Sequence, residues 1–310
     1  MKKNLSNIKK AIKYLNNNDC VGIPTETVYG LAGNAYSNKA SLKIFRIKKR
    51  QKKNPLIVHY YNLKLLKKDC EISDQFLKLY KEFCPGPLSF ILKLKKNSLI
   101  SKNVTNNKKT LAVRFPKHPL TRILLKKLKY PLAAPSANIS SKISPVSKED
   151  VVDEFGKNIK FILNGGQSKI GLESTIISLI GKPRILRLGG TEKNKINKFL
   201  KMNINYSNKN KKIIVPGQSK LHYSPEIPIR LNIKNPKYNE AFILINKRKL
   251  NERNFYYLSK NRNLKEAAKN LYKTLRKIKK NKYKNIAVEK IPNIGLGEAI
   301  NDRLKRASKF

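Results

Sequence analysis

The turn Pro24–Leu31, with the sequence PTETVYGL, is the first stretch whose residue types could do chemistry. It carries two threonine hydroxyls and a carboxylate beside a glycine, and glycine lets the backbone approach a ligand closely. Such a turn can hold a small polar ligand. A capped turn held by ordinary side-chain-to-backbone hydrogen bonds explains this stretch, taken alone, equally well.

Cationic side chains form the next two candidates. The run Lys48–Leu56 places Arg50 among lysines before a short apolar segment. Arginine offers bidentate donors and lysine a point charge, so the run could clamp a triphosphate, although a solvated face is the commoner reason for such a run. Arg114 lies inside the apolar segment LAVRFP, where a buried guanidinium needs an anionic partner. That partner could be a ligand or a structural ion pair.

Small and hydroxyl-bearing residues follow two later apolar runs. Ala133–Asn138 reads AAPSAN, which suits either close packing of a nucleotide or a plain serine–proline loop. Glu173–Thr175 and Arg187 stand at predicted strand ends, where α/β folds bind ligands. The three histidines are scattered, and a lone histidine is more often packed or at the surface than a catalytic base.

Several common catalytic motifs are missing from the sequence. It has no G-x-S-x-G elbow, no H-E-x-x-H and no G-x-G-x-x-G. Gly166 and Gly171 have the spacing of a phosphate-binding P-loop, but Leu172 and Glu173 follow where lysine and a hydroxyl residue are required. Any nucleotide must therefore be bound without a P-loop.

Apolar patterns along the chain alternate between helix and strand periodicity, which predicts an α/β layer fold. Predicted helices cover 6–17, 38–49, 73–83, 118–129, 263–280 and 297–308. Ser73 should cap one helix, and Ser147 with Asp150 should form a capping box. Predicted strands include 20–24, 55–61, 87–94, 110–116, 161–163, 174–180, 184–188, 241–246 and 285–292. Residues 191–213 are polar and weakly patterned, so we expect domains at 1–192 and 227–310, joined by a linker at 193–226.

The composition limits the classes of function that this chain can have. The 310 residues include 69 Lys and Arg against 19 Asp and Glu, a net charge of +50. This charge favours nucleic-acid binding, but it is spread along the whole chain, as compositional drift would spread it. Cys20, Cys70 and Cys84 are too few and too far apart for a disulfide framework or a cysteine zinc site, and we expect each to be a buried free thiol. Without a spanning apolar segment or a signal-like start, the expected location is the cytoplasm, with no membrane contact.

Six motifs occur together in one order: PTETVYGL, the K-x-R segment leading to NPLIVH, LAVRFP, PLAAPSAN, EST and ILRLGG. In that order they resemble the YrdC-type threonylcarbamoyl-AMP synthase family, over roughly residues 5–190. Pro216-Gly217, His222–Pro225 and the stretch 295–304 resemble its longer two-domain subtype. The resemblance implies a twisted open YrdC-like sheet with flanking helices, a linker that acts as a lid, and a smaller Rossmann-like α/β domain.

The resemblance also implies a reaction. L-Threonine, bicarbonate and ATP would give threonylcarbamoyl-adenylate and pyrophosphate. A partner transferase would then modify adenosine 37 of tRNA. Magnesium would enter with ATP as substrate, without a tightly bound cofactor and without a protein metal site. Such chemistry needs positioning and charge neutralisation more than a protein nucleophile.

Individual roles follow from the same resemblance. The implied threonine contacts are Thr27, His59, Arg114, Ala134 and Ser174. The implied ATP contacts are Lys48, Arg50, Asn54, Thr110, Ser136, Asn138, Ser144, Arg187 and Tyr223, with Lys48 and Arg50 catalytic. The chain departs from the family pattern at Lys49, where glycine is common, and at Gln51, where proline is usual.

Two other functions remain open at this stage. Carbamoyl transfer in hydrogenase maturation uses a similar domain, but it needs acylphosphatase and zinc-finger modules for which this chain lacks the cysteines. A non-enzymatic module that binds double-stranded RNA or tRNA, or that assists ribosome assembly, would account for the net charge.

Overall fold

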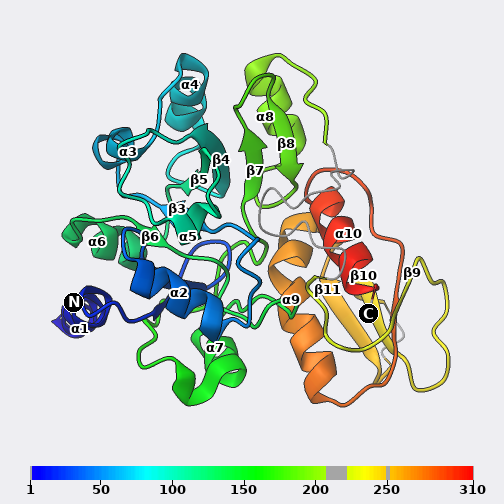
Figure 1. The fold of residues 1–310 in the computed structure, drawn as a ribbon. Helices are drawn as coiled ribbons and strands as arrows, with labels where there is room; N and C mark the ends of the chain where they lie inside the picture. The colour runs from blue at the N-terminus through cyan, green and yellow to red at the C-terminus, as the bar shows by residue number, and fades with distance from the viewer. Residues whose placement is uncertain (1, 207–221, 249–251, 310) are drawn as a thin grey trace.

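A computed structural model describes residues 2–206, 222–248 and 252–309 of the chain. The N-terminal part, blue to green in Figure 1, is built on one large sheet, and the yellow-to-red C-terminal part packs beside it. Pro216-Gly217, one of the motifs noted above, lies outside the described residues.

The first sheet has eight strands in the order β1-β2-β6-β3-β5-β4-β7-β8. Their bounds are β1 Val21–Ile23, β2 Gly30–Asn34, β3 Ile57–His59, β4 Leu88–Lys93, β5 Thr110–Arg114, β6 Leu132–Ala133, β7 Thr175–Ser178 and β8 Arg184–Arg187. The sheet is mixed, with β3 parallel to β5 and β4 parallel to β7.

Register within this sheet brings distant residues to one end of it. His59 pairs with Arg114 across β3 and β5, and Arg114 pairs with Ser89 across β5 and β4. On the other side, β4 and β7 align Ser89 with Ile176, which in turn pairs with Arg187 on β8. The last residues of β3, β5 and β8 therefore share one end of the sheet.

Amphipathic helices cover this sheet, and short side-chain caps fix where several of them begin. Ser73 accepts a hydrogen bond from the backbone of Phe76, and Ser147 forms a reciprocal capping box with Asp150, as predicted. The helices are α1 Lys2–Asn16, α2 Asn38–Ile47, α3 Leu63–Asp69, α4 Asp74–Phe83, α5 Lys102–Thr105, α6 Pro119–Lys127, α7 Lys148–Phe155 and α8 Lys193–Leu200, with a 3₁₀ turn at Gly156–Asn158.

The C-terminal part has its own four-stranded sheet, all parallel, in the order β11-β10-β12-β9. Its elements are β9 Ile229–Leu231, β10 Ala241–Asn246, β11 Phe255–Ser259, α9 Leu264–Lys280, β12 Ile286–Val288 and α10 Leu296–Ala307. The strands are parallel, α9 connects β11 to β12 and α10 follows β12, which is the Rossmann-like type of arrangement that was expected, so the α/β class is confirmed for both parts.

Some local predictions were wrong. Residues 161–163 do not form a strand; Ile162 makes only an isolated bridge to Gly22. The strands β2 and β6 were not predicted, because β2 is glycine- and alanine-rich and β6 has only two residues. The prediction of a buried thiol is wrong for Cys84, which is only half-buried at the end of α4; Cys20 and Cys70 are buried, and all three are free thiols.

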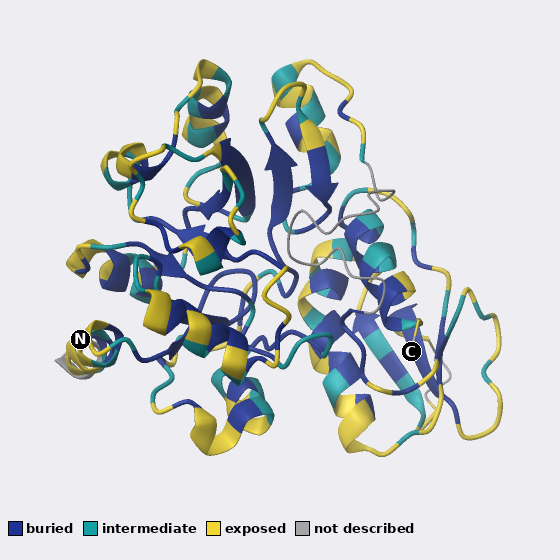
Figure 2. Cartoon of the chain, in the orientation of Figure 1, coloured by how far each residue is buried: buried dark blue, intermediate teal, exposed yellow. Residues whose placement is uncertain are grey.

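The two parts share an apolar core. One cluster of buried side chains runs from Cys20 in the first part to Ala307 at the end of α10, and Figure 2 shows buried backbone on both sides of the junction. Gly171 fits here because a Cβ would stand 2.6 Å from the Lys269 backbone of α9, and its φ of +75° also favours glycine. The C-terminal part is therefore packed against the loop that leads into β7.

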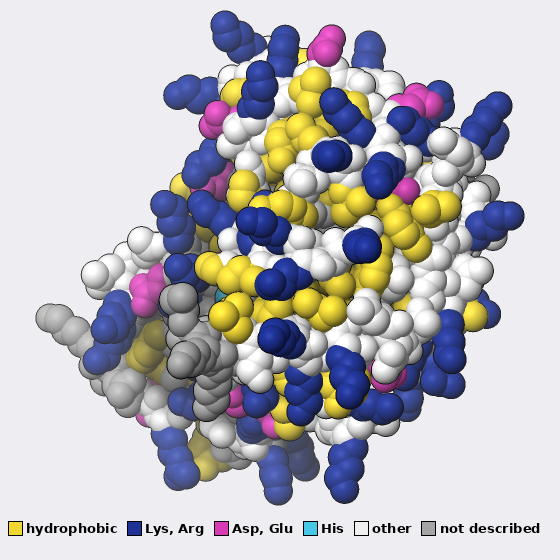
Figure 3. Space-filling model, turned by 90° about the vertical axis from the view of Figure 1, so that its left-hand side faces the viewer, with side chains coloured by type: hydrophobic (Ala, Val, Ile, Leu, Met, Phe, Trp, Pro, Cys, Tyr) yellow, Lys and Arg dark blue, Asp and Glu magenta, His cyan; other side chains and the backbone are white. Residues whose placement is uncertain are grey.

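Positive charge is spread over the surface. Figure 3 shows Lys and Arg side chains across the whole of one face, with apolar side chains between them, rather than in one stripe. Within the described ranges, no helix is both long enough and apolar enough to cross a bilayer.

Candidate functional site

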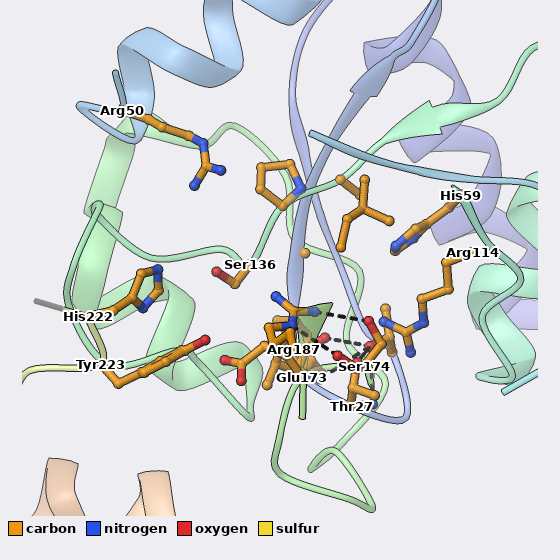
Figure 4. A pocket seen from close by; sticks show the side chains of 17 residues that line it. Thr27, Arg50, His59, Arg114, Ser136, Glu173, Ser174, Arg187, His222 and Tyr223 are labelled. Carbon is orange, nitrogen blue, oxygen red and sulfur yellow. Dashed lines mark hydrogen bonds between the residues drawn. The ribbon is translucent and has the colours of Figure 1, made fainter. Parts of the chain in front are cut away.

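A cavity opens at the shared end of β3, β5 and β8. It is lined by the Thr25–Gly30 turn, the loop after β6, the segment before β7, and His222 and Tyr223 near the end of the predicted linker (Figure 4). Nine of the predicted site residues line it: Thr27, Arg50, His59, Arg114, Ala134, Ser136, Ser174, Arg187 and Tyr223.

The threonine turn presents a hydrogen-bond acceptor to this cavity. Thr25 Oγ1 lies 2.6 Å from the carbonyl oxygen of Val28 and donates to it. Its single proton is thereby used, so the 2.7 Å contact between the two hydroxyls must be donated by Thr27. The lone pairs of the Thr27 oxygen remain to accept a donor from a ligand.

Arg114 comes to the cavity with a carboxylate partner. Its Nη2 lies 2.7 Å from Glu26 Oε1, and its Nε donates to the Gly86 carbonyl at 3.3 Å. Both side chains are buried. From the sequence, the anionic partner of Arg114 could be either a structural ion pair or a ligand. The structure contains the ion pair, with Glu26, and the same guanidinium also faces the cavity (Figure 4).

Arg50 has a different set of partners. It donates through Nε to the Asn54 carbonyl and through Nη2 to the Pro55 carbonyl, each at 3.2 Å. No carboxylate among the described residues forms an ion pair with it. Burial, and then repulsion from Arg187, lowers the pKa of Arg50 to about 9. An anionic ligand in the cavity would relieve this uncompensated charge.

Arg187 reaches the cavity from the end of β8. Its Nε donates to the Ser174 carbonyl and its Nη2 to Ser174 Oγ, both at 3.0 Å. Ser174 Oγ also lies 2.7 Å from the Oγ of Ser89, which is on the neighbouring strand β4. The serine and the arginine are therefore fixed as a unit on the cavity wall.

Five predicted residues do not line the cavity. Lys48 is fully buried behind it, where its ammonium donates to the carbonyls of Ser136 and Asn138, and burial followed by the charge of Arg50 lowers its pKa well below the usual value. Ser144 donates to Glu173 at 2.6 Å. Thr110 begins β5, about 13 Å along the strand from Arg114.

The two remaining residues outside the lining are asparagines. Asn54 contributes its carbonyl to Arg50, and Asn138 donates to the carbonyls of Ile139 and Lys142. The side-chain oxygens of both are buried without a partner among the described residues. Each is an acceptor that a small movement or a ligand would have to satisfy.

Two imidazoles border the cavity, and both are neutral. Burial, then the charge of Arg114, lowers the pKa of His59 far below 6.5. Burial also lowers the pKa of His222 to about 3. Neither Nδ1 has a partner among the described residues. His222 had no site role in the sequence-based prediction, although its position beside Tyr223 was a usable signal.

Tyr223 closes one side of the cavity. Its backbone has a φ of 65°, a conformation that a bulky residue adopts only where the surroundings impose it. The ring is buried, its hydroxyl has no partner among the described residues, and burial raises its pKa to about 12. It is therefore a neutral donor at the cavity wall.

Sequence reasoning also gave no role to Glu173, which lines the cavity beside Ser174. Besides Ser144, its partners are Tyr272 in α9 and Arg303 in α10, about a hundred residues or more along the chain, so no local signal could have found them. Within the described residues, no group of three His, Cys, Asp or Glu side chains could hold a metal ion.

Comparison with known proteins places this arrangement in a family. The family model Sua5_yciO_yrdC, described as "Telomere recombination", matches residues 13–189, and Sua5_C, the C-terminal domain of threonylcarbamoyl-AMP synthase, matches 191–309. The threonylcarbamoyl-AMP synthase of Bacillus subtilis is 35% identical over 97% of this chain and 92% of its own length. That of Pyrococcus abyssi is 33% identical over 98% and 94%.

A solved structure agrees over nearly the whole chain. The crystal structure of P. abyssi Sua5 complexed with L-threonine superposes with a TM-score of 0.89 at 31% identity, covering 97% of this chain and 94% of that one. The resemblance seen in the six motifs is thereby confirmed, including its two-domain form. The chain belongs to the Sua5-type two-domain threonylcarbamoyl-AMP synthases, which join a YrdC-like domain to a Sua5 C-terminal domain.

Proposed function

We propose that this cavity makes L-threonylcarbamoyladenylate and pyrophosphate from L-threonine, bicarbonate and ATP. The observation that carries the proposal is that Arg50, Arg114 and Arg187 reach one cavity from three separate elements. The printed name of the relatives and the L-threonine in the P. abyssi structure support it. Both substrates are anionic at the ends that must be held.

Threonine would occupy the side of the cavity around Arg114. Because Glu26 already balances much of the Arg114 charge, this side suits a zwitterion better than a polyanion. The threonine carboxylate would pair with Arg114, and Thr27 would accept a hydrogen bond from the amino acid. His59, Ala134 and Ser174 would complete the wall around it.

ATP would occupy the side around Arg50 and Arg187. Arg50, which lacks a carboxylate partner, would meet the phosphates, together with Arg187. Ser136 and the Tyr223 hydroxyl would add neutral hydrogen bonds. Lys48, Asn54, Asn138 and Ser144 would act from behind the lining, by fixing the loops that carry these groups.

The chemistry has two steps. The threonine amine attacks the carbon of bicarbonate, and water leaves as the carbamate forms. A carbamate oxygen then attacks the α-phosphorus of ATP, and pyrophosphate leaves. The arginines hold the two anions close together and neutralise the charge that develops on the phosphates, so no protein nucleophile is required. Magnesium would enter on the phosphates of ATP, as part of the substrate.

The product is a reactive mixed anhydride, so a second enzyme has to consume it. We propose a transferase that moves the threonylcarbamoyl group to adenosine 37 of tRNA. The spread of Lys and Arg over the surface allows an RNA contact on this protein as well, and salt-dependent filter binding would measure it.

Substrate omission tests the proposal. Purified protein should release pyrophosphate only when ATP, threonine and bicarbonate are all present. Release that proceeds at the same rate without threonine would contradict it. Tight, salt-sensitive RNA binding without any threonine-dependent turnover would favour an RNA-binding module instead.

A further inference from the structure

Glu173 is a buried carboxylate on the cavity wall whose partners come mainly from the C-terminal part. Its Oε2 accepts from Arg303 Nε on α10 at 2.9 Å and from the Tyr272 hydroxyl on α9 at 2.9 Å. Its Oε1 accepts from Ser144 at 2.6 Å and from the same tyrosine at 3.0 Å. The C-terminal part thus supplies the only cation paired with Glu173 among the described ion pairs.

Arg303 holds the cavity wall at two points. It is 1% exposed, and besides Glu173 it donates from Nη2 to the Leu188 carbonyl at 2.7 Å. Glu173 immediately precedes Ser174, and Leu188 immediately follows Arg187. The Arg303 guanidinium of α10 therefore binds the residue next to Ser174 and the residue next to Arg187, and Ser174 and Arg187 are themselves hydrogen-bonded to each other.

Glu173 lies under the influence of two cations. Burial alone would raise its pKa, but the charges of Arg303 and then Arg187, with the hydrogen bonds, lower it to about 2. In Figure 4 its carboxylate lies next to the Arg187 side chain. If Arg303 were lost, the carboxylate would be a buried, uncompensated charge, and Arg187 is the cation left to attract it.

We propose that Arg303 is a positioning residue for the reaction: by pairing with Glu173 it keeps that carboxylate off Arg187 and leaves the Arg187 guanidinium to the phosphates of ATP. This inference rests on the proposed function, which assigns Arg187 to ATP. It gives the C-terminal domain a defined task in the active site, carried by a side chain that contacts no substrate.

A second-site rescue tests the idea. Arg303→Met should raise the KM for ATP about tenfold or more, because Glu173 then competes with the phosphates, and should change the KM for threonine much less. Adding Glu173→Gln removes the competing charge, so the double variant should recover most of the lost ATP affinity. Because removing a stranded carboxylate also restores stability, the deciding readout is the difference between the two KM values: a merely structural loss would raise the KM for threonine as much as the KM for ATP.

The matched control is Glu298→Gln, which breaks another ion pair of α10, with Lys193, away from the cavity. It should leave both KM values near those of the wild type. Thermal melting checks that each variant folds; should Arg303→Met fail to fold, Arg303→Gln with and without Glu173→Gln carries the same comparison, because glutamine removes the positive charge but keeps an amide that can donate hydrogen bonds.

An unchanged KM for ATP in a folded Arg303 variant, or a double variant no better than the single one, overturns the inference. Wild-type protein that releases no pyrophosphate with all three substrates overturns the proposed function instead. The two failures are therefore distinguishable in one series of assays.

Discussion

The two sides of the cavity differ in how their cations are balanced. On one side, Arg114 is paired with Glu26 at 2.7 Å inside the first domain. On the other, the hydrogen bonds of Arg50 to described residues go to backbone carbonyls, and Arg187 contacts Ser174. The carboxylate nearest Arg187, Glu173, is held by Arg303 from the C-terminal domain.

This difference suggests how one cavity sorts two substrates. A side that is already close to neutral can accept a zwitterion without a large change in buried charge. A side on which Arg50 has no carboxylate partner among the described residues is costly when empty and is stabilised by a polyanion. The charge balance of each side therefore matches one of the two proposed substrates.

The largest effect is expected from removing Arg50, the cation without a carboxylate partner among the described residues. Arg50→Ala should lower kcat/KM, and the loss should correspond to about 3–4 kcal/mol of transition-state stabilisation, because the phosphate charge loses its main partner. The melting temperature should change little, since removing Arg50 leaves no buried carboxylate without its partner. Pyrophosphate release measures the first effect, and Arg46→Ala, an exposed position on α2, the helix that precedes Arg50, is the control.

Removing the compensated cation should behave differently. Arg114→Ala should cost about 2–4 kcal/mol in transition-state stabilisation, measured by kcat/KM for threonine. It should also lower the melting temperature, because Glu26 is then a buried charge without its partner. Adding Glu26→Gln should restore stability without restoring activity; activity within a few-fold of wild type in the single variant would refute the assigned role.

Acid should weaken the junction between the domains. The pKa of Glu173 is about 2 in the folded protein, below its ordinary 4.5, so unfolding takes up a proton in this range. The stabilisation is complete above about pH 4.5 and is lost as the pH falls toward 2, a contribution on the order of 3 kcal/mol. Urea unfolding at pH 6 and pH 3 should show this loss, and Glu173→Gln should reduce the difference.

The smallest expected effect concerns the loop that carries Arg50. Lys49 has a φ of 47°, in the left-handed region, which explains why glycine suits this position. Lys49→Gly should raise the free energy of unfolding by about 1 kcal/mol. Lys52→Gly, at a neighbouring loop position without a positive φ, should lower it slightly; equal effects of the two changes would contradict this explanation.

Local signals in the sequence were enough for much of the fold and for most of the cavity wall. Long amphipathic segments with Ser73 and Ser147 as caps, and apolar runs such as the one that contains Arg114, predicted most helices and strands. Motif residues at strand ends then met at one end of the sheet, because parallel and antiparallel register brought those ends together.

What escaped prediction depends on contacts between distant segments. Glu173 and Arg303 are 130 positions apart and meet only once both domains have packed. Lys48 reads as part of a solvated cationic run, but the fold buries it against the carbonyls of Ser136 and Asn138. The domain boundaries at 192 and 226 stay a prediction.

The most direct test of the account is calorimetric binding of each substrate to the two arginine variants. Arg50→Ala should lose most of its affinity for ATP and keep its affinity for threonine, while Arg114→Ala should lose threonine and keep ATP. If either variant loses both ligands equally while still folded, the two sides of the cavity do not divide the substrates between them.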